Sequence, residues 1–257
     1  MNSCTSALFL SGQILGLKEG DEVICTPRTF WIITWPMLVC KCKIRFADIE
    51  ADSLNIDPTK IEPLVTEKIK AIYVVHHSGQ AVDMDPVLKI ARKYNLRVVE
   101  DCAHTPGALY KCRHVCTMGD VGCFSFHSLK NVTTGEGGML VTNSAELYEF
   151  AEPLGTIHRY GRMHDRQDKR IGPYSKPAYY RDWHTKQSFN KDYDNDQFEF
   201  GNNYRMSELQ AAVGLVQLSK LEKLYDHQRE IAKRLDEGLS GIPGVTIQKE
   251  QHYARHI

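Results

Sequence analysis

One strand–helix–strand unit limits the fold of this chain more than any other feature of its sequence. Residues Ile69–Val75 (IKAIYVV) are rich in β-branched side chains and almost continuously apolar, which predicts a strand covered on both faces. Asp85 and Pro86 supply an N-cap and a first-turn proline for a helix. This helix is predicted to end near Asn95, and residues 96–100 (LRVVE) predict the next strand. Because such a crossover is right-handed and parallel, we expect an α/β protein with a mainly parallel sheet flanked by helices.

Further strands and helices are predicted on both sides of this unit. Apolar residues at helical spacing follow Thr5, and residues 22–25 (EVIC) form a short strand candidate. Residues 122–126 and 138–142 are strand candidates, and the glycine-bearing turn between them suits a tight connection better than a dinucleotide-binding loop. Ser207 opens the motif SELQ, which has the form of a capping box and predicts another helix.

The composition excludes several classes of protein. Of the 257 residues, 42% are apolar and 25% are charged, which is average for a globular protein and excludes a disordered or collagen-like chain. The 32 Lys and Arg residues balance the 32 Asp and Glu residues, so no net charge draws the chain to nucleic acid. The longest apolar stretch, residues 30–39, contains Pro36 and is too short to cross a membrane, so we expect a buried segment.

Cysteine usage and the start of the chain bear on location and on metal binding. No secretory leader pattern opens the sequence, and we expect a cytoplasmic protein. The eight cysteines lack regular spacing, which favours reduced, buried thiols over a disulfide framework. Cys112, His114 and Cys116 lie close together, and Cys40 and Cys42 form a second pair. Neither spacing matches a closed zinc site, so we predict no structural metal.

Asp101 is the first candidate for a functional side chain. It follows the predicted strand 96–100, and ligands of open α/β sheets bind beyond the carboxyl ends of the strands. An aspartate at such a position can also be a helix cap or a turn former. The residue pattern alone leaves both interpretations open.

Several sequence blocks carry a more specific signal. Residues 98–111 (VVEDCAHTPGALYK) and 119–143 (GDVGCFSFHSLKNVTTGEGGMLVTN) resemble the aspartate and lysine blocks of the DegT/DnrJ/EryC1/StrS family of pyridoxal-phosphate-dependent sugar aminotransferases. Further blocks resemble the family in the same order, at residues 2–8, 20–30, 79–99 and 203–221. The resemblance covers nearly the whole chain except residues 156–200.

The resemblance implies the fold type I of pyridoxal-phosphate enzymes and a division into domains. We expect residues 1–200 to form the large cofactor-binding domain, with residues 156–200 as a long insertion. Residues 201–257 would form a linking helix and the start of a C-terminal small domain. Compared with the family pattern, the chain is expected to be truncated at both ends and its small domain to be incomplete.

Lys130 and Asp101 are the catalytic residues that the resemblance implies. Lys130 matches the lysine that forms an imine with the cofactor aldehyde, and only a lysine amine can do this and later carry a proton. Asp101 matches the carboxylate that keeps the pyridinium nitrogen protonated, so that the ring can accept electrons. Without the resemblance, Lys130 would be interpreted as a solvated lysine in a turn.

Two further residues match positions beside the cofactor ring. His104 falls where family members place a Gln or His near the ring and its phenolic oxygen, although a lone histidine is more often a surface residue. Phe30 matches the aromatic residue that stacks on the ring, and its alternative is ordinary core packing.

The remaining candidates match the phosphate site of the family. Thr5 and Ser6 open the first predicted helix, whose N-terminus can supply backbone N–H donors. Ser125 matches a hydroxyl that contacts the phosphate, and Asn203 matches an asparagine that reaches it from the second subunit. The resemblance therefore implies a homodimer with shared active sites, although Asn203 could also be a cap before the Ser207 helix.

The family implies transfer of an amino group from glutamate or glutamine to a keto sugar. The substrate class is a nucleotide-linked 4-keto or 3-keto deoxysugar for surface polysaccharide or secondary-metabolite synthesis, and no nucleic acid or membrane partner is expected. Alternatives are amination of a cyclitol or related keto ring, or a silent truncated paralogue that only dimerises. Lys130 argues against a sugar dehydratase, because family members of that type carry histidine at this position.

Two segments depart from the family pattern. Residues 156–200 interleave Lys, Arg and Tyr with acidic residues, so they could grip a nucleotide diphosphate or form a solvated insertion. Cys112 and Cys116 stand where relatives commonly have glycine, which predicts strain in a turn.

Overall fold

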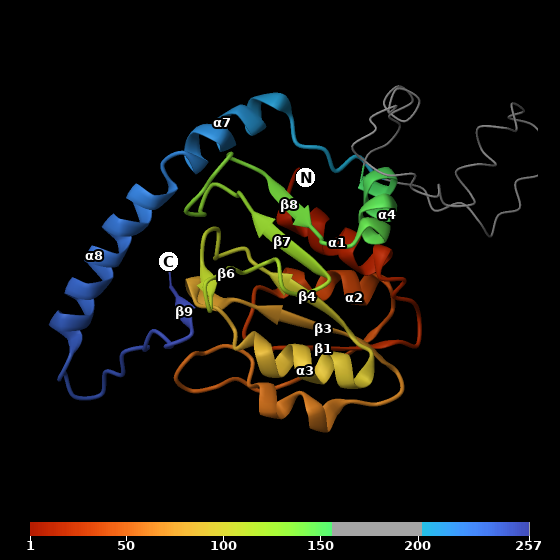
Figure 1. Ribbon diagram of the computed structural model, residues 1–257, viewed down its shortest axis with the longest axis horizontal. Coiled ribbons are helices and arrows are strands. Elements are labelled where there is room, and N and C mark those ends of the chain that lie inside the picture. Colours follow the sequence, from red (N-terminus) through yellow and green to blue (C-terminus); the bar gives the residue numbers. More distant parts are fainter. Residues whose placement is uncertain (156–201, 257) are drawn as a thin grey trace, which may run out of the picture.

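The computed structural model describes residues 1–155 and 202–256 (Figure 1). At its centre lies a six-stranded sheet with the strand order β2-β1-β3-β4-β7-β8. Neighbouring strands are parallel except β7 and β8, which are antiparallel. The prediction of an α/β protein with a mainly parallel sheet is therefore confirmed. The strands span Glu22–Cys25 (β1), Lys43–Phe46 (β2), Ile69–Val75 (β3), Arg97–Asp101 (β4), Val121–Ser125 (β7) and Gly138–Val141 (β8).

The predicted crossover joins β3 to β4 through α3 (Met84–Tyr94). The two strands pair in parallel register, and the last residue of β3, Val75, lies opposite the last residue of β4, Asp101. On the next strand, Asp101 lies opposite Cys123 of β7. The carboxyl ends of β3, β4 and β7 therefore meet at one edge of the sheet.

Helix α3 begins two residues earlier than the pattern of Asp85 and Pro86 indicates. Asp83 is the N-cap residue, with extended backbone angles (φ −67°, ψ 93°). The backbone N–H of Asp85 donates to the hydroxyl of Tyr110 at 3.1 Å, so this first-turn donor is satisfied from outside the helix. The predicted end of the helix is confirmed, because Asn95 is a left-handed C-cap with φ 52°.

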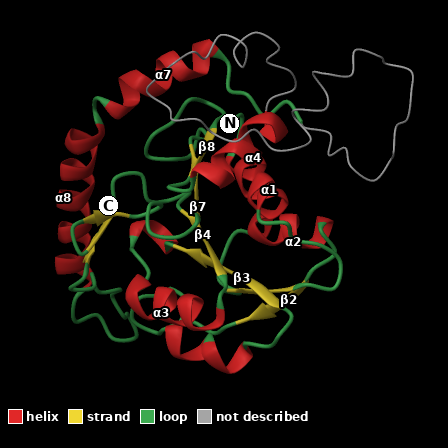
Figure 2. Cartoon of the chain, turned by 45° about the vertical axis from the view of Figure 1, so that its right-hand side comes forward, coloured by secondary structure: helices red, strands yellow, loops and turns green. Residues whose placement is uncertain are grey.

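Helices cover both faces of the sheet (Figures 1 and 2). One face carries α1 (Cys4–Ile14), α2 (Trp35–Val39) and α4 (Ala145–Gly155), and the opposite face carries α3. Short 3-10 turns span Trp31–Thr34, Pro58–Lys60, Glu62–Leu64 and His77–Gly79. On β4, Val99 packs into the core beneath α1, whereas Val98 packs into the core beneath α3. This alternation places the side chains of consecutive β4 residues on opposite faces.

Gly138, the first residue of β8, allows the start of the chain to approach closely. The N–H of Gly138 donates to the carbonyl of Met1 at 3.0 Å. A Cβ atom at Gly138 would lie 2.3 Å from the carbonyl carbon of Ser3, which leaves no room for a side chain. The two strands pair antiparallel through the connection formed by residues 126–137, and the N-terminus of α1 lies beside β8.

Two consecutive helices follow the segment that the structure does not describe. They are α7 (Glu208–Leu218) and α8 (Leu221–Leu239), and together they arch around one side of the molecule (Figure 1). The predicted capping box is confirmed: the Ser207 hydroxyl accepts the N–H of Gln210, whose side chain accepts the N–H of Ser207.

Helix α8 contacts the loop that follows Asp101. Tyr225 is 1% exposed, and its hydroxyl donates to the carbonyl of Pro106. A Cβ atom at Gly107 would lie 2.9 Å from the Tyr225 ring, so the glycine lets the helix approach. A small antiparallel sheet closes the same side, with the order β6 (Arg113–His114), β5 (Leu109–Tyr110) and β9 (Ala254–Arg255).

The prediction that residues 30–39 form a buried segment is wrong. Only Ile33, Pro36 and Met37 of this stretch are buried. Ile32 is partly buried, and five other large apolar residues are between 45% and 63% exposed, namely Phe30, Trp31, Trp35, Leu38 and Val39. The reason is geometric, because a single helical turn of 3-10 type followed by the short α2 packs one face on α1 and leaves the other uncovered. None of the helices described is long and apolar enough to cross a membrane.

The cysteines at glycine-like positions have the strained backbone that the sequence predicts. Cys112 has φ 64° and Cys116 has φ 72°, both in the left-handed region. The proposed insertion at 156–200 lies outside the described residues, and the domain boundary near residue 200 stays a prediction.

Candidate active site

The carboxyl edge of the sheet contains a cavity of about 410 Å³. Its wall comes from the loops that follow β3, β4 and β7, and from α8 and the C-terminal segment. The side chains on the loops are Ser78, Ala103, His104, Pro106, Leu129, Lys130 and Asn131, and those opposite are Gln228, Arg229, Ala232 and His256. Two of the predicted site residues, His104 and Lys130, therefore line one cavity.

Asp101 ends β4 and lies at the same edge. Its side chain is 4% exposed, and the N–H of Ala103 donates to Oδ1 at 3.0 Å. Burial raises the pKa of Asp101 to about 6, although the Ala103 N–H and the charge of Lys130 pull it down. This carboxylate has few internal donors, so a cationic partner placed beside it would gain a strong interaction.

Lys130 follows β7 in a tight turn, in which its N–H donates to the carbonyl of His127 at 2.9 Å. Its positive charge acts on Asp101, on His104 and on the thiol of Cys4, which places the amine within electrostatic reach of all three. The structure thus brings the predicted pair Lys130 and Asp101 to one edge from two neighbouring strands.

His104 is half-buried, and its Nδ1 accepts the N–H of Ser78 at 3.2 Å. Burial lowers the pKa of His104 to about 4, and the charges of Lys130 and His77 act in the same direction. The ring is therefore neutral near pH 7 with its single proton on Nε2, where it can donate to a ligand. Ser78 presents its N–H from a left-handed conformation with φ 52°.

The start of α1 supplies a cluster of small polar groups. The Ser6 hydroxyl is buried and donates to Oδ1 of Asn2 at 2.5 Å, and it lies 2.9 Å from the hydroxyl of Ser3. Ser3 is the N-cap residue, so the helix begins at Cys4 and Thr5 is an exposed residue of its first turn. Ser125 is the last residue of β7, and its hydroxyl accepts the N–H of His127 at 3.4 Å.

Six of the predicted site residues do not line the cavity, namely Thr5, Ser6, Phe30, Asp101, Ser125 and Asn203. Phe30 is 63% exposed and contacts the ring of Trp31, with 5.6 Å between ring centroids, and it does not line the cavity. Asn203 is exposed, and its Oδ1 accepts from Nε of Arg205 at 3.0 Å. The predicted roles of these residues stay predictions.

Sequence reasoning missed the far wall of the cavity. Nε2 of His256 lies 2.8 Å from the carbonyl of Ser78, and the carbonyl of His256 accepts from Nε of Arg229 at 2.9 Å. Arg229 also donates to Glu250 at 2.9 Å, which fastens the C-terminal segment to α8. No local pattern marks these residues, because three segments far apart in sequence create the wall.

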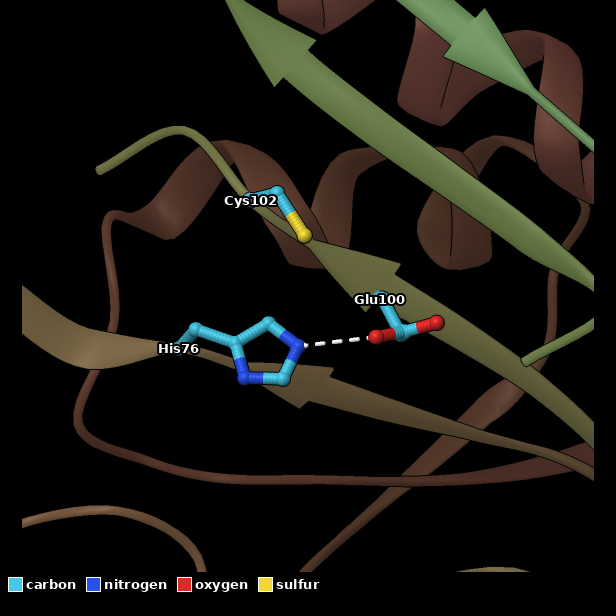
Figure 3. A group of neighbouring side chains, drawn as sticks. All are labelled: His76, Glu100 and Cys102. Atoms are coloured by element: carbon cyan, nitrogen blue, oxygen red, sulfur yellow. Dashed lines mark hydrogen bonds and ion pairs between the residues drawn. The ribbon is translucent and has the colours of Figure 1, made fainter. Parts of the chain in front are cut away.

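A group of potential metal ligands lies behind the site (Figure 3). The ligand atoms of His76, Glu100 and Cys102 are buried and lie within 4.8 Å of one another. Nδ1 of His76 accepts the N–H of Val82 at 3.0 Å, so the ring proton is on Nε2 and donates to Glu100 at 3.0 Å. The nitrogen lone pair that a metal would need is therefore not available. We interpret the group as structural.

The comparisons with known proteins agree with this geometry. The Bacillus subtilis spore coat polysaccharide biosynthesis protein SpsC is 37% identical over 256 residues, which cover 100% of this chain and 61% of that protein. The UDP-4-amino-4,6-dideoxy-N-acetyl-beta-L-altrosamine transaminase of Campylobacter jejuni is 34% identical over 263 residues, covering 100% of this chain and 62% of the transaminase. This chain therefore spans about three fifths of the length of these relatives.

The solved structures point to the same class. The crystal structure of the aminotransferase TlmJ from Streptoalloteichus hindustanus matches with a TM-score of 0.82 and 26% identity, covering 99% of this chain and 62% of that one. The fold is thus that of the aminotransferase class. The model of the DegT/DnrJ/EryC1/StrS aminotransferase family matches residues 1–257, and the chain belongs to this family.

Proposed function

We propose that this protein is a pyridoxal-phosphate-dependent aminotransferase that moves an amino group from glutamate or glutamine to a keto sugar. One observation carries the proposal: a buried aspartate and a lysine meet at the carboxyl edge of the sheet, and the lysine lines a cavity of about 410 Å³. The family to which the chain belongs supports the same activity.

The residues at this edge fit the cofactor. Pyridoxal phosphate, when bound, supplies an aldehyde and an electron-withdrawing ring. Nζ of Lys130 would hold the cofactor covalently and carry the proton that moves during transfer. Asp101 would pair with the ring nitrogen. Its pKa is raised by burial, and a cationic partner beside the carboxylate would offset this effect.

The other predicted residues would orient the cofactor. The neutral His104 would donate from Nε2 to an oxygen of the ring, because Ser78 already occupies its Nδ1. Ser6 and Ser125 would bind the phosphate together with Thr5 and the first-turn N–H groups of α1. Phe30 would stack on the ring.

We infer a nucleotide-linked keto deoxysugar as the substrate, for a surface polysaccharide or a secondary metabolite. The names of the two relatives support this class, since one is a transaminase of a UDP-linked sugar and the other serves spore coat polysaccharide synthesis. A second cavity of about 530 Å³ adjoins the first and shares Arg229, Ala232 and His256 with it. Together they would hold a substrate larger than a single sugar ring.

We also infer a cytoplasmic homodimer with shared active sites. Exposed apolar side chains on α7 support an interface, because Leu209, Val213 and Val216 are between 47% and 82% exposed on one helix. The uncovered face of residues 30–39 supports it as well. Asn203 would then reach the phosphate of the partner subunit.

The test is a visible absorption spectrum of the full chain with pyridoxal phosphate, followed by borohydride reduction and peptide mapping. We expect a covalent adduct on Lys130, and release of 2-oxoglutarate when glutamate is added. Lys130→Ala should abolish both, whereas Lys41→Ala removes an exposed lysine at the other end of the sheet and should change neither. An adduct on another lysine, or none, would contradict the proposal and favour a silent paralogue.

A further inference from the structure

Glu100 precedes Asp101 on β4 and is the acidic centre behind the candidate site. Its carboxylate is fully buried and accepts four hydrogen bonds. Oε2 accepts from Nε2 of His76 at 3.0 Å and from the N–H of Cys116 at 2.8 Å. Oε1 accepts the N–H groups of Met118 at 2.7 Å and Gly119 at 2.6 Å. Each oxygen therefore binds two donors.

The contact with His76 links Glu100 to His104. The ring of His76 bridges two segments. Its Nε2 donates to Glu100 (Figure 3), and its Nδ1 accepts the N–H of Val82. This bridge closes the turn between residues 76 and 82. Ser78 lies inside the turn and donates its N–H to Nδ1 of His104 at 3.2 Å. The orientation of the His104 ring thus depends on a turn that Glu100 anchors.

The second set of contacts leads from Glu100 toward Lys130. The backbone of residues 116–119 wraps the carboxylate immediately before β7 begins at Val121. Residues 116–119 pack tightly against β7, since a Cβ atom at Gly122 would lie 2.3 Å from the carbonyl oxygen of Cys116. β7 then ends at Ser125, and the turn that follows carries Lys130.

A carboxylate is the only side chain at position 100 that can satisfy all of these donors. A buried charge is costly unless hydrogen bonds compensate for it, and here three backbone N–H groups and an imidazole N–H do so. A glutamine would keep one acceptor oxygen and would turn an NH2 group toward two N–H donors. Glu100 also faces away from Asp101, on the α3 side of the sheet, so it has no direct contact with the cavity.

We propose that Glu100 is a positioning residue of the candidate site, which orients His104 through His76 and Ser78 and places the strand leading to Lys130 through residues 116–119. It acts on both walls of the cavity from the opposite face of the sheet. Neither the family relationship nor the proposed transfer reaction assigns it this role.

The experiment compares Glu100→Gln with Glu22→Gln in the full chain without cofactor. Glu22 is a matched control, because it is a buried carboxylate at the start of β1 that accepts hydrogen bonds from Arg45 and Thr66. Imidazole NMR at neutral pH reports the tautomer and ring environment of each histidine. We expect the His104 resonances to move in Glu100→Gln and to keep their positions in Glu22→Gln, while both variants lose stability.

Two further variants separate the two routes, and they provide a measurement if Glu100→Gln does not fold. His76→Gln removes the bridge between Glu100 and Val82 that closes the turn around Ser78, and it leaves the contacts of Glu100 with residues 116–119 in place. We expect it to move His104 as Glu100→Gln does. Glu100→Asp keeps the charge but withdraws the carboxylate by one methylene, and an intermediate shift is expected. His104 resonances that stay unchanged in His76→Gln and Glu100→Asp would overturn the proposal.

The rate at which pyridoxal phosphate forms the adduct on Lys130 tests the route from Glu100 to Lys130. It does not test the route from Glu100 to His104. If the wild-type chain forms the Lys130 adduct, Glu100→Gln should form it about ten- to a hundredfold more slowly, because a displaced reacting group loses rate steeply. Glu22→Gln should form it at the wild-type rate, and equal rates in both variants would overturn the route to Lys130. A wild-type chain that forms no adduct would contradict the proposed function, and the histidine spectra would still decide whether Glu100 positions His104.

Discussion

The two faces of β4 present two buried acids with opposite surroundings. Asp101 faces the α1 side, where one backbone N–H among residues 1–155 and 202–256 reaches its side chain, and burial raises its pKa to about 6. Glu100 faces the α3 side, where burial acts in the same direction but the hydrogen bonds from His76, Gly119 and Met118 hold its pKa below its ordinary value. The pKa values of two similarly buried carboxylates therefore shift in opposite directions, because the number of hydrogen-bond donors decides whether the charged form is stabilised.

This difference has a functional meaning. Glu100 is satisfied within the protein and is suited to holding its neighbours in place. Asp101 is short of donors and is suited to binding something that the chain itself does not contain. The comparison thus separates an acid that supports the site from an acid that serves as part of it.

Asp101→Asn should have the largest effect of the substitutions at these two acids. This change removes the negative charge with little change in shape, so we expect amino transfer to fall by about a thousandfold or more. Folding should be unaffected or improved, because the neutral amide is cheaper to bury. Release of 2-oxoglutarate from glutamate measures the first effect, and thermal unfolding measures the second. A fall in stability together with activity would mean that Asp101 is structural like Glu100.

The converse substitution, Glu100→Gln, should act on stability. Two buried N–H donors would lose their acceptor, at a cost of about 2 kcal/mol each, or about 4 kcal/mol in all. Denaturant unfolding at neutral pH measures this loss. If Glu100→Gln were as stable as the wild type, the four hydrogen bonds would not compensate the buried charge as the geometry implies.

The pH dependence of stability should distinguish the two acids. Asp101 has a raised pKa, so below about pH 6 the folded state binds a proton that the unfolded state, with its pKa near 3.8, releases. The contribution of Asp101 therefore becomes more favourable as the pH falls from about 6 to about 4, by up to about 3 kcal/mol. Glu100 behaves in the opposite way, since its stabilisation is present above its ordinary pKa of 4.5 and is lost as the pH falls further.

The measurement is the difference in unfolding free energy between wild type and Asp101→Asn across this range. We expect the advantage of the asparagine variant to shrink between pH 6 and pH 4. A difference that stays constant would show that the pKa of Asp101 is not raised in the folded protein.

The smallest effect concerns the two cysteines with a left-handed backbone, Cys112 and Cys116. Cys112 is exposed and has φ 64°, so Cys112→Gly should relieve backbone strain and stabilise the fold by about 1 kcal/mol. Cys116 has φ 72° but is buried against the core beneath α3, so Cys116→Gly should lose packing and gain less or nothing. Thermal unfolding of the two variants checks the pair, and equal gains would mean that the Cys116 side chain contributes nothing to packing.

Much of the site follows from local sequence patterns. Because the crossover is parallel, the residues after β3, β4 and β7 must meet at one edge, and this places Asp101 near the turn of Lys130. The capping box at Ser207 and the left-handed end at Asn95 were equally predictable, because they depend on neighbouring residues only.

Other features have no local signal. The apolar run 30–39 predicts burial, yet half of its residues are exposed, because burial depends on which elements pack above it. Ser78, Arg229 and His256 line the cavity from distant segments, and no pattern in any one of them predicts the others. Alternation along β4 predicts that Glu100 and Asp101 face opposite sides, but not which of them is supplied with donors.

Short segments of the sequence were enough to predict the strand–helix–strand architecture, the order of the family blocks, the acid that ends β4 and the lysine that follows β7. The surroundings of each acid, in contrast, depend on the tertiary structure. The donors of Glu100 come from residues 76 and 116–119, and the far wall of the cavity comes from α8 and the C-terminal segment. Hydrogen bonding and burial depend on atoms brought together from distant parts of the chain, and only folding brings them within reach of one another.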